Sequence, residues 1–213
     1  VAVNWAQVNL WMLRKLCGLD FVVEGLEHVP ARPCVLYWKH ESVWETMAGA
    51  LTLPPQTWVV KRELMWLPFF GWGLALLKPI AINRAAGRTA VKQVIAQGQE
   101  RLAQGLCVVI YPEGTRVLPG QARRFGVSGA ALAKAAGCPI LPVAHNAGDF
   151  WPRRSLLKRP GTIRVVIGPP IEPEGLTPDE ITARGRDWIQ AATARISPHR
   201  PVPQATPRRT VRA

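Results

Sequence analysis

Short apolar runs alternate along the chain with longer segments in which apolar residues recur every three or four positions. The continuous runs are typical of strands buried on both faces, and they span residues 21–25, 34–38, 58–60, 106–111, 140–144 and 162–167. Helical spacing predicts helices over residues 4–17, 42–53, 87–104, 125–136 and 178–196. Strands that alternate with helices predict an α/β domain with a largely parallel central sheet flanked by helices.

The first predicted helix is amphipathic. Trp5, Val8, Trp11 and Met12 fall near one of its faces. Two placements are open for this helix: on the surface, packed against the core, or within a membrane interface.

The end of the chain differs from the alternating pattern. From residue 197 onward the sequence is rich in Pro and Arg and has no apolar periodicity. We therefore expect one domain, residues 1–196, with a membrane-proximal amphipathic helix in residues 1–20, and a disordered basic tail, residues 197–213.

Composition narrows the classes of partner. Lys and Arg outnumber Asp and Glu by 27 to 14, so the net charge is +13 and either nucleic acid or an anionic membrane is favoured. The sequence has no zinc-finger spacing and no RNP-type strand, which argues against nucleic acid, while its nine Trp suit a membrane interface. Its cysteines, Cys17, Cys34, Cys107 and Cys138, lie far apart, so we expect buried thiols and neither a disulfide framework nor a metal site.

The first candidate site pairs His40 with Glu45, just after the predicted strand 34–38. α/β folds bind ligands at the carboxyl ends of strands. A neutral imidazole there can take a proton from an alcohol that attacks a carbonyl, and a carboxylate on the other ring nitrogen would fix the tautomer. Glu41 is a weaker candidate for that carboxylate, because adjacent residues rarely face one another. On its own, the pair is more typical of a capping or surface His beside a solvated Glu.

Two further segments carry groups that bind phosphate. The residues after strand 106–111 offer close backbone approach, a hydroxyl and a bidentate guanidinium, and they are Glu113, Gly114, Thr115 and Arg116. Arg84 follows a short apolar run and offers a second phosphate contact, although a solvated Arg is an equal interpretation. With His40, these segments make acyl transfer to a phosphate-bearing alcohol the leading hypothesis.

Together these blocks resemble the glycerolipid acyltransferase family, in particular the bacterial 1-acyl-sn-glycerol-3-phosphate acyltransferases. Residues 40–45 are similar to the HxxxxD motif, and residues 80–84 to a second motif that ends in Arg. Residues 112–116 match the PEGTR motif in full, and residues 139–143 are similar to a strand motif that carries Pro. The four blocks keep the family's order, so the resemblance implies a glycerol-phosphate acyltransferase-like fold.

The resemblance implies a role for each matching residue. His40 would deprotonate the sn-2 hydroxyl of 1-acyl-sn-glycerol 3-phosphate, and Glu45 would orient His40. Pro142 would shape the pocket for the acyl chain, and the glycerol phosphate would be held by Arg84, Glu113, Gly114, Thr115 and Arg116. The acyl donor would be a thioester of coenzyme A or acyl carrier protein, and phosphatidic acid would be the product. No cofactor, metal or covalent acyl-enzyme is implied.

Glu45 departs from the family's motif, which has Asp at this position. Either the chain belongs to a branch that uses Glu with compensating backbone placement, or its catalysis is impaired. The intact block at residues 113–116 favours the first. Two alternatives stay open: an acyltransferase for another lysophospholipid or lyso-lipid, and a non-catalytic membrane-binding homologue.

A lysophospholipid substrate implies an anionic membrane surface as partner, with acyl carrier protein as a further partner if it carries the donor. Residues 66–72 are aromatic and offer membrane contacts, as do the clustered cations Arg153, Arg154, Lys158 and Arg159. The longest apolar stretch, residues 67–77, falls short of the roughly 18 residues of a membrane span. Positive charge fits the cytoplasmic face of a bacterial inner membrane.

Overall fold

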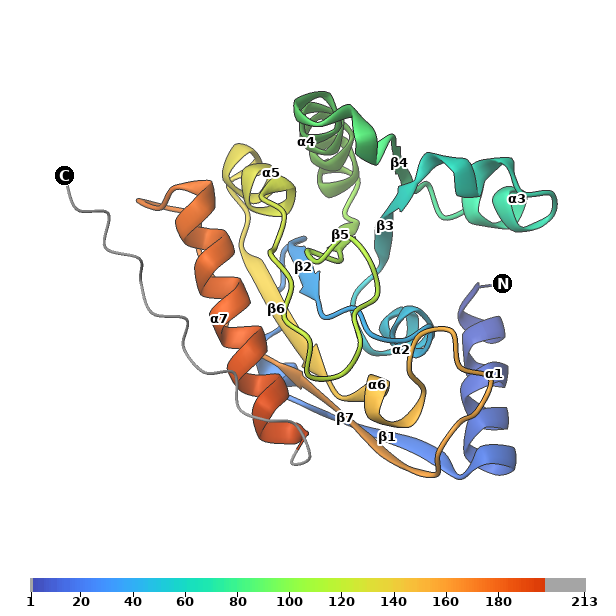
Figure 1. Ribbon diagram of the computed structural model, residues 1–213. Coiled ribbons are helices and arrows are strands. Elements are labelled where there is room, and N and C mark those ends of the chain that lie inside the picture. Colours follow the sequence, from blue (N-terminus) through green and yellow to red (C-terminus); the bar gives the residue numbers. More distant parts are fainter. Residues whose placement is uncertain (1, 198–213) are drawn as a thin grey trace.

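A seven-stranded sheet lies at the centre of the computed structural model, which describes residues 2–197 (Figure 1). Its strands are β1 (Leu19–Glu24), β2 (Val35–Trp38), β3 (Gln56–Lys61), β4 (Ile80–Ile82), β5 (Cys107–Ile110), β6 (Ile140–His145) and β7 (Gly161–Ile167). Their order is β1-β7-β6-β2-β5-β3-β4, and only the pairing of β6 with β7 is antiparallel. The predicted α/β class with a largely parallel sheet is confirmed.

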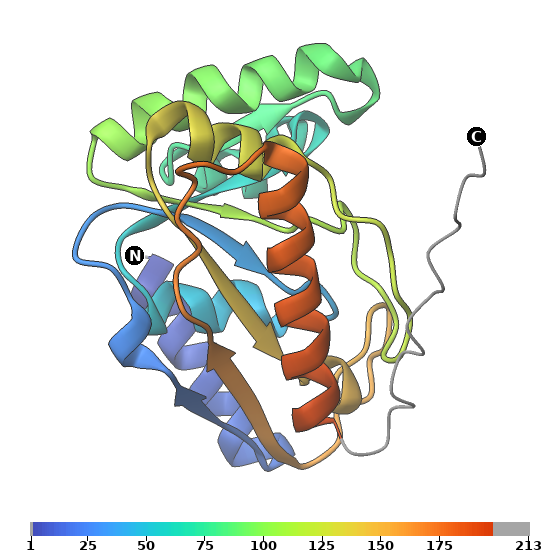
Figure 2. The same ribbon diagram turned by 90° about the vertical axis from the view of Figure 1, so that its left-hand side faces the viewer.

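Helices cover both faces of this sheet. They are α1 (Ala2–Cys17), α2 (Trp44–Thr52), α3 (Phe70–Ala75), α4 (Arg88–Ala103), α5 (Ser128–Ala136), α6 (Ala147–Phe150) and α7 (Pro178–Ile196), with 3-10 turns η1 (Leu26–His28), η2 (Arg62–Trp66) and η3 (Arg84–Ala86). Helices α4, α5 and α7 share one hydrophobic core with the sheet, as Figure 2 shows from their side. Helices α1 and α2 pack into a second core on the opposite face.

The central strand β2 shows why the inner strands are continuously apolar. Val35 and Tyr37 enter the core under α5 and α7, whereas Leu36 and Trp38 enter the core under α1 and α2. Successive side chains point to opposite faces of a strand, so a strand covered on both sides needs an apolar residue at every position.

Most predicted boundaries lie close to the observed ones. The last helix spans the predicted residues, and its start is fixed by a capping box between Thr177 and Glu180 with Pro178 in the first turn. The helix predicted from residue 125 begins at Ser128, because Phe125 is packed in the core ahead of it. The short helical elements η1, η2, η3, α3 and α6 were not predicted, and the tail after Ser197 lies outside the described residues.

Helix α1 packs on the core through a face other than the one formed by its large aromatic residues. Ala6, Leu10 and Leu13 are buried, whereas Trp5 and Trp11 point to solvent. The helix is therefore a surface helix with an apolar outer side. Among the helices of residues 2–197, none has the length and apolar character needed to cross a membrane.

The sheet determines where chemistry can occur. Strands β6, β2, β5, β3 and β4 run parallel, so their carboxyl ends meet at one edge. His40 follows β2, Tyr111 follows β5 and Arg84 follows β4, while His145 ends β6. The predicted site residues from distant segments are thereby brought to the same edge.

Close packing of α5 on β2 leads to a stability prediction. A Cβ atom built on Gly129 would lie 2.2 Å from Cε1 of Tyr37, far inside contact distance. We expect Gly129→Ala to lower the free energy of unfolding by about 1–3 kcal/mol, measured by urea denaturation. Gly73→Ala is the matched control, since no atom lies within 4 Å of its added methyl group. Equal stability of both variants would contradict the packing.

Candidate active site

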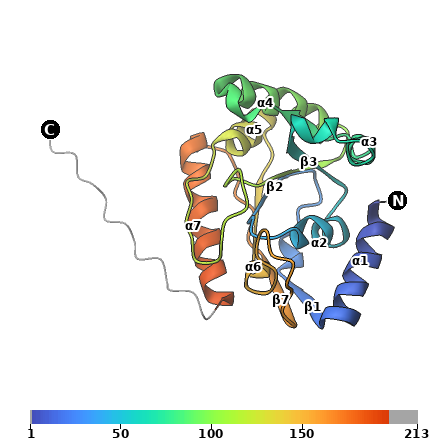
Figure 3. The same ribbon diagram turned by 45° about the vertical axis from the view of Figure 1, so that its right-hand side comes forward.

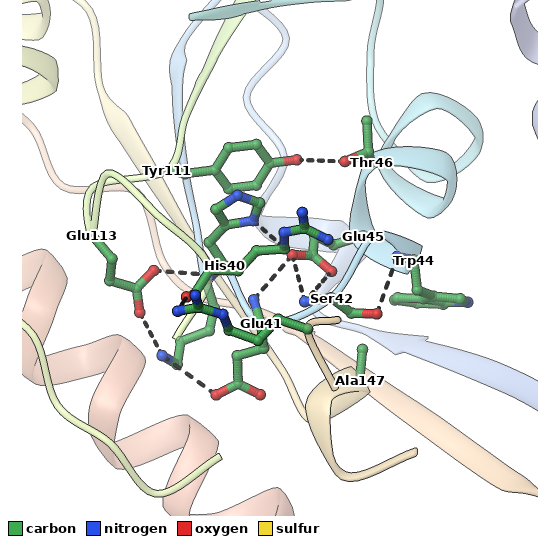
Figure 4. A network of polar contacts seen from close by, with 12 residues as sticks. His40, Glu41, Ser42, Trp44, Glu45, Thr46, Tyr111, Glu113 and Ala147 are labelled. Atoms are coloured by element: carbon green, nitrogen blue, oxygen red, sulfur yellow. Dashed lines mark hydrogen bonds and ion pairs between the residues drawn. The ribbon is translucent and has the colours of Figure 1, made fainter. Parts of the chain in front are cut away.

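The imidazole of His40 is held in a fixed plane at the end of β2. Its ring stacks on Tyr111, with centroids 3.9 Å apart and planes inclined by 16°. Figure 4 shows the His40 ring between Tyr111 and the loop that leads into α2. The Tyr111 hydroxyl is 3.2 Å from the Thr46 hydroxyl, which ties the stacked pair to α2.

Glu45 reaches the imidazole despite standing where the motif has Asp. Oε1 of Glu45 lies 2.8 Å from Nδ1 of His40. When Glu45 is ionised its carboxylate only accepts hydrogen bonds, so Nδ1 then carries the proton and Nε2 presents a lone pair. Within residues 2–197, Nε2 of His40 makes no hydrogen bond and is free to accept a proton.

The longer Glu side chain fits because it folds back over the start of its own helix. Glu45 is in the first turn of α2, and its carboxylate accepts the backbone N–H groups of Glu41 at 3.0 Å and Ser42 at 3.0 and 3.1 Å. These donors and the positive end of the helix stabilise a negative charge there. The structure thus shows the compensating backbone placement that one interpretation of Glu45 required.

Burial sets the protonation of this pair. Loss of solvation lowers the pKa of His40 to about 3, and the positive charges of Arg116 and Arg84 act in the same direction against Glu113. Burial also raises the pKa of Glu45 to about 7, opposed by His145 and by the backbone N–H donors. His40 is consequently neutral at pH 7, the form that a general base requires.

Two arginines, Arg84 and Arg153, donate hydrogen bonds to backbone carbonyls of the loop that follows β5. The guanidinium of Arg84 donates to the carbonyl of Gly114, so the Arg that ends the second motif, residues 80–84, reaches this loop. Gly114 adopts φ 70°, a conformation that favours glycine. The carbonyl of Arg116 accepts a hydrogen bond of 2.7 Å from Arg153, and the N–H of Val117 donates to the carbonyl of His40 at 2.9 Å. The loop is thus joined to the backbone of His40.

Glu113 has a different environment from its neighbours in the motif. The residue is 3% exposed, and its carboxylate pairs with the ammonium of Lys39 and accepts the backbone N–H of His40 at 2.9 Å. Lys39 is also buried and lies 3.4 Å from Glu41. Burial raises the pKa of Glu113, while Lys39 lowers it. Both oxygens of Glu113 therefore face protein groups.

The remaining predicted residues are placed less directly. Thr115 lies in the loop between Gly114 and Arg116, and no role beyond that position is visible. Pro142 is buried in β6 opposite Tyr37, and its carbonyl accepts from Gly168. The structure brings together the other predicted residues but does not place Pro142 in contact with His40, and its pocket role stays a prediction.

Three contributors were not predicted: Tyr111, Lys39 and His145. Tyr111 precedes the PEGTR motif and Lys39 precedes His40, so their positions next to predicted site residues could have identified both. His145 comes directly after the predicted strand 140–144, the same kind of position that marked His40, so this signal was available but was not used. In the described part of the chain, no group of three or more His, Cys, Asp or Glu side chains could hold a metal ion.

Known proteins resemble this chain in both sequence and fold. A model of the acyltransferase family matches residues 20–146. A 1-acyl-sn-glycerol-3-phosphate acyltransferase from Pseudomonas aeruginosa is 47% identical over 201 residues, which is 93% of this chain and 78% of that protein. The human 1-acyl-sn-glycerol-3-phosphate acyltransferase alpha is 30% identical, over 83% of this chain and 64% of its own length.

A solved structure agrees in fold. The crystal structure of a 1-acyl-sn-glycerophosphate acyltransferase from Thermotoga maritima matches with a TM-score of 0.77 at 23% identity, over 92% of this chain and 78% of that one. The chain therefore belongs to the acyltransferase family, as its four motifs predicted.

The His40–Glu45 contact predicts different effects for two substitutions. Glu45→Gln places an amide N–H donor or a weaker acceptor against Nδ1 and disturbs the tautomer, so we expect acyl transfer to fall by about 100- to 10,000-fold. Glu45→Asp keeps the carboxylate, so this variant should retain most of the acyl-transfer activity that Glu45→Gln loses. Rates of thioester consumption measure both. A fully active Gln variant would refute the role of the carboxylate.

The same substitution has a signature in stability. The pKa of Glu45 in the folded chain is raised, so stability present below its ordinary value of 4.5 is lost as the pH rises through about 7. The melting temperature of Glu45→Gln should therefore exceed that of the wild type at about pH 8, and the difference between the two melting temperatures should shrink near pH 5. Thermal midpoints at both pH values provide the measurement.

Proposed function

We propose that the protein transfers an acyl chain from a thioester to the sn-2 hydroxyl of 1-acyl-sn-glycerol 3-phosphate and so forms phosphatidic acid for phospholipid synthesis. The observation that carries this proposal is a neutral imidazole oriented by a buried carboxylate beside two arginines. The names of the bacterial and human relatives support the same acceptor.

The chemistry follows from the free lone pair of His40. The acceptor hydroxyl gives its proton to Nε2 while its oxygen attacks the thioester carbonyl. Glu45 stabilises the imidazolium that forms. The tetrahedral intermediate expels the thiolate, which takes the proton from His40, so the histidine returns to its neutral form. Acyl-CoA and acyl carrier protein thioesters both satisfy this scheme, and no cofactor enters it.

Arg84 and Arg116 are the groups suited to hold the acceptor's phosphate. Both are close enough to lower the pKa of His40, and they lie on the loop side of the imidazole. A phosphate bound between them would bring two negative charges to a region that now holds an excess of positive charge. The acceptor's hydroxyl would then be positioned beside Nε2.

The apolar surface suits a bilayer that contains such a lipid. Exposed apolar residues lie on η2, on α3 and next to both ends of α3: Trp66, Phe69, Phe70, Trp72 and Leu76, of which Phe69 is 80% exposed. Helices α1 and α3 project from the same side of the molecule (Figures 1 and 3). With the net charge of +13, this surface supports binding to an anionic membrane, which we place on the cytoplasmic face of the bacterial inner membrane.

Thiol release from acyl-CoA tests the function. Wild-type protein should release thiol when lysophosphatidate is added, and His40→Ala should reduce the rate by about 100- to 10,000-fold because the base is lost. His28→Ala is the matched control, since His28 contacts the carbonyl of Ile167 rather than the site.

An acceptor panel separates the alternatives. Arg116→Ala should raise KM for lysophosphatidate far more than for a 1-acylglycerol without phosphate, because only lysophosphatidate carries the negative phosphate that Arg116 would bind. If the wild type prefers lysophosphatidylcholine to lysophosphatidate, the alternative of an acyltransferase for another lysophospholipid would be favoured. Thioester left unconsumed with every acceptor would refute the enzyme and leave the membrane-binding alternative.

Vesicle sedimentation tests the membrane surface. Trp5→Ser combined with Trp11→Ser should weaken binding to anionic phospholipid vesicles by about tenfold or more, because both side chains are exposed and apolar. Leu26→Ser is the control, as Leu26 is 53% exposed but lies on η1. Unchanged binding of the double Trp variant would contradict the role of α1.

A further inference from the structure

One peptide group, the one that joins Lys39 to His40, is held at both of its polar atoms by buried side chains. Its carbonyl accepts a hydrogen bond of 2.8 Å from Nε2 of His145, and its N–H donates to Glu113 at 2.9 Å. The carbonyl and N–H of a trans peptide point in opposite directions. His145 and Glu113 therefore hold the plane of this peptide from opposite sides, directly before the base.

The His145 side of this contact has a defined polarity. Nδ1 of His145 accepts the backbone N–H of Ala147 at 3.1 Å, so Nε2 carries the ring proton and donates to Lys39. His145 is fully buried, and Nε2 is also 4.0 Å from Oε2 of Glu45. Burial lowers the pKa of His145, which keeps the ring neutral. A protonated ring would have no lone pair for Ala147.

The Glu113 side is held by charge. The ammonium of Lys39 pairs with one oxygen of Glu113, which leaves the other oxygen for the N–H of His40. Figure 4 shows Glu113 on the opposite side of the His40 backbone from Glu45. A carboxylate that is enclosed in this way cannot approach a phosphate without leaving its partners, and like charges would repel.

We infer that His145 and Glu113 are positioning residues that clamp the Lys39–His40 peptide, and that Glu113 is not a phosphate ligand. The clamp fixes the backbone from which the imidazole extends, so Nε2 meets the acceptor hydroxyl at a constant position. Misplacement of a reacting group by about 1 Å costs about 100-fold in rate. This inference rests on the proposed function for its kinetic test.

Steady-state kinetics with lysophosphatidate separates positioning from binding. His145→Phe keeps a ring but removes the donor, and Glu113→Leu removes the acceptor; each should lower kcat by about 10- to 100-fold with KM changed by less than about twofold. His145→Gln and Glu113→Gln retain a polar group for the peptide and should recover part of kcat. Glu172→Gln is the control, because it breaks an exposed ion pair with Arg32.

Hydrogen exchange of the His40 amide gives a readout independent of activity. Exchange should accelerate in Glu113→Leu and in His145→Phe, and return toward the wild-type rate in the Gln variants, which also guard against loss of folding. A raised KM with unchanged kcat in the Glu113 variants would overturn the inference, as would unchanged kcat and exchange in both series. Absence of transfer by the wild type would refute the proposed function, and amide exchange alone would then decide the clamp.

Discussion

A buried carboxylate against an imidazole is the interaction on which the site depends. Glu45 is 1% exposed, and its oxygens are shared between Nδ1 of His40 and the N–H groups at the start of α2. This contact keeps the proton on Nδ1 and leaves the lone pair on Nε2, the atom that acts as the base in the proposed function. Its cost is the loss of solvation of a charge, which is visible in the raised pKa of Glu45. The buried charge of Glu45 thus lowers the stability of the fold, and in return it fixes the tautomer of His40.

The sheet makes this interaction possible. Parallel strands bring residues from distant parts of the sequence to one edge, so His40 meets Tyr111 and Glu113 there, and Arg84 reaches the carbonyl of Gly114 in the neighbouring loop. The arginines make the surroundings of His40 positive and help keep it neutral, while the same charges suit an anionic acceptor. In the proposed function, binding and general-base chemistry would therefore use a single electrostatic environment.

The sequence predicted the sheet class, most elements and the family, because continuous apolar runs and motif spacing are local signals; the roles of the site residues stay predictions. It could not show that Glu45 reaches His40, since that depends on how the loop at Glu41 and Ser42 turns into α2. It also could not reveal the partners of Glu113. Long-range burial, rather than local pattern, pairs Glu113 with Lys39 and brings His145 under the peptide before His40. The outward face of α1 was ambiguous because both of its sides carry apolar residues.

Nitrogen NMR of the histidine rings tests the central claim most directly. In protein labelled with nitrogen-15 at histidine, His40 at about pH 8, where Glu45 is ionised, should show a protonated Nδ1 and an unprotonated Nε2, whereas His145 should show the reverse. The opposite tautomer for His40, or an imidazolium at about pH 7, would contradict the account of Glu45 as the group that prepares the base.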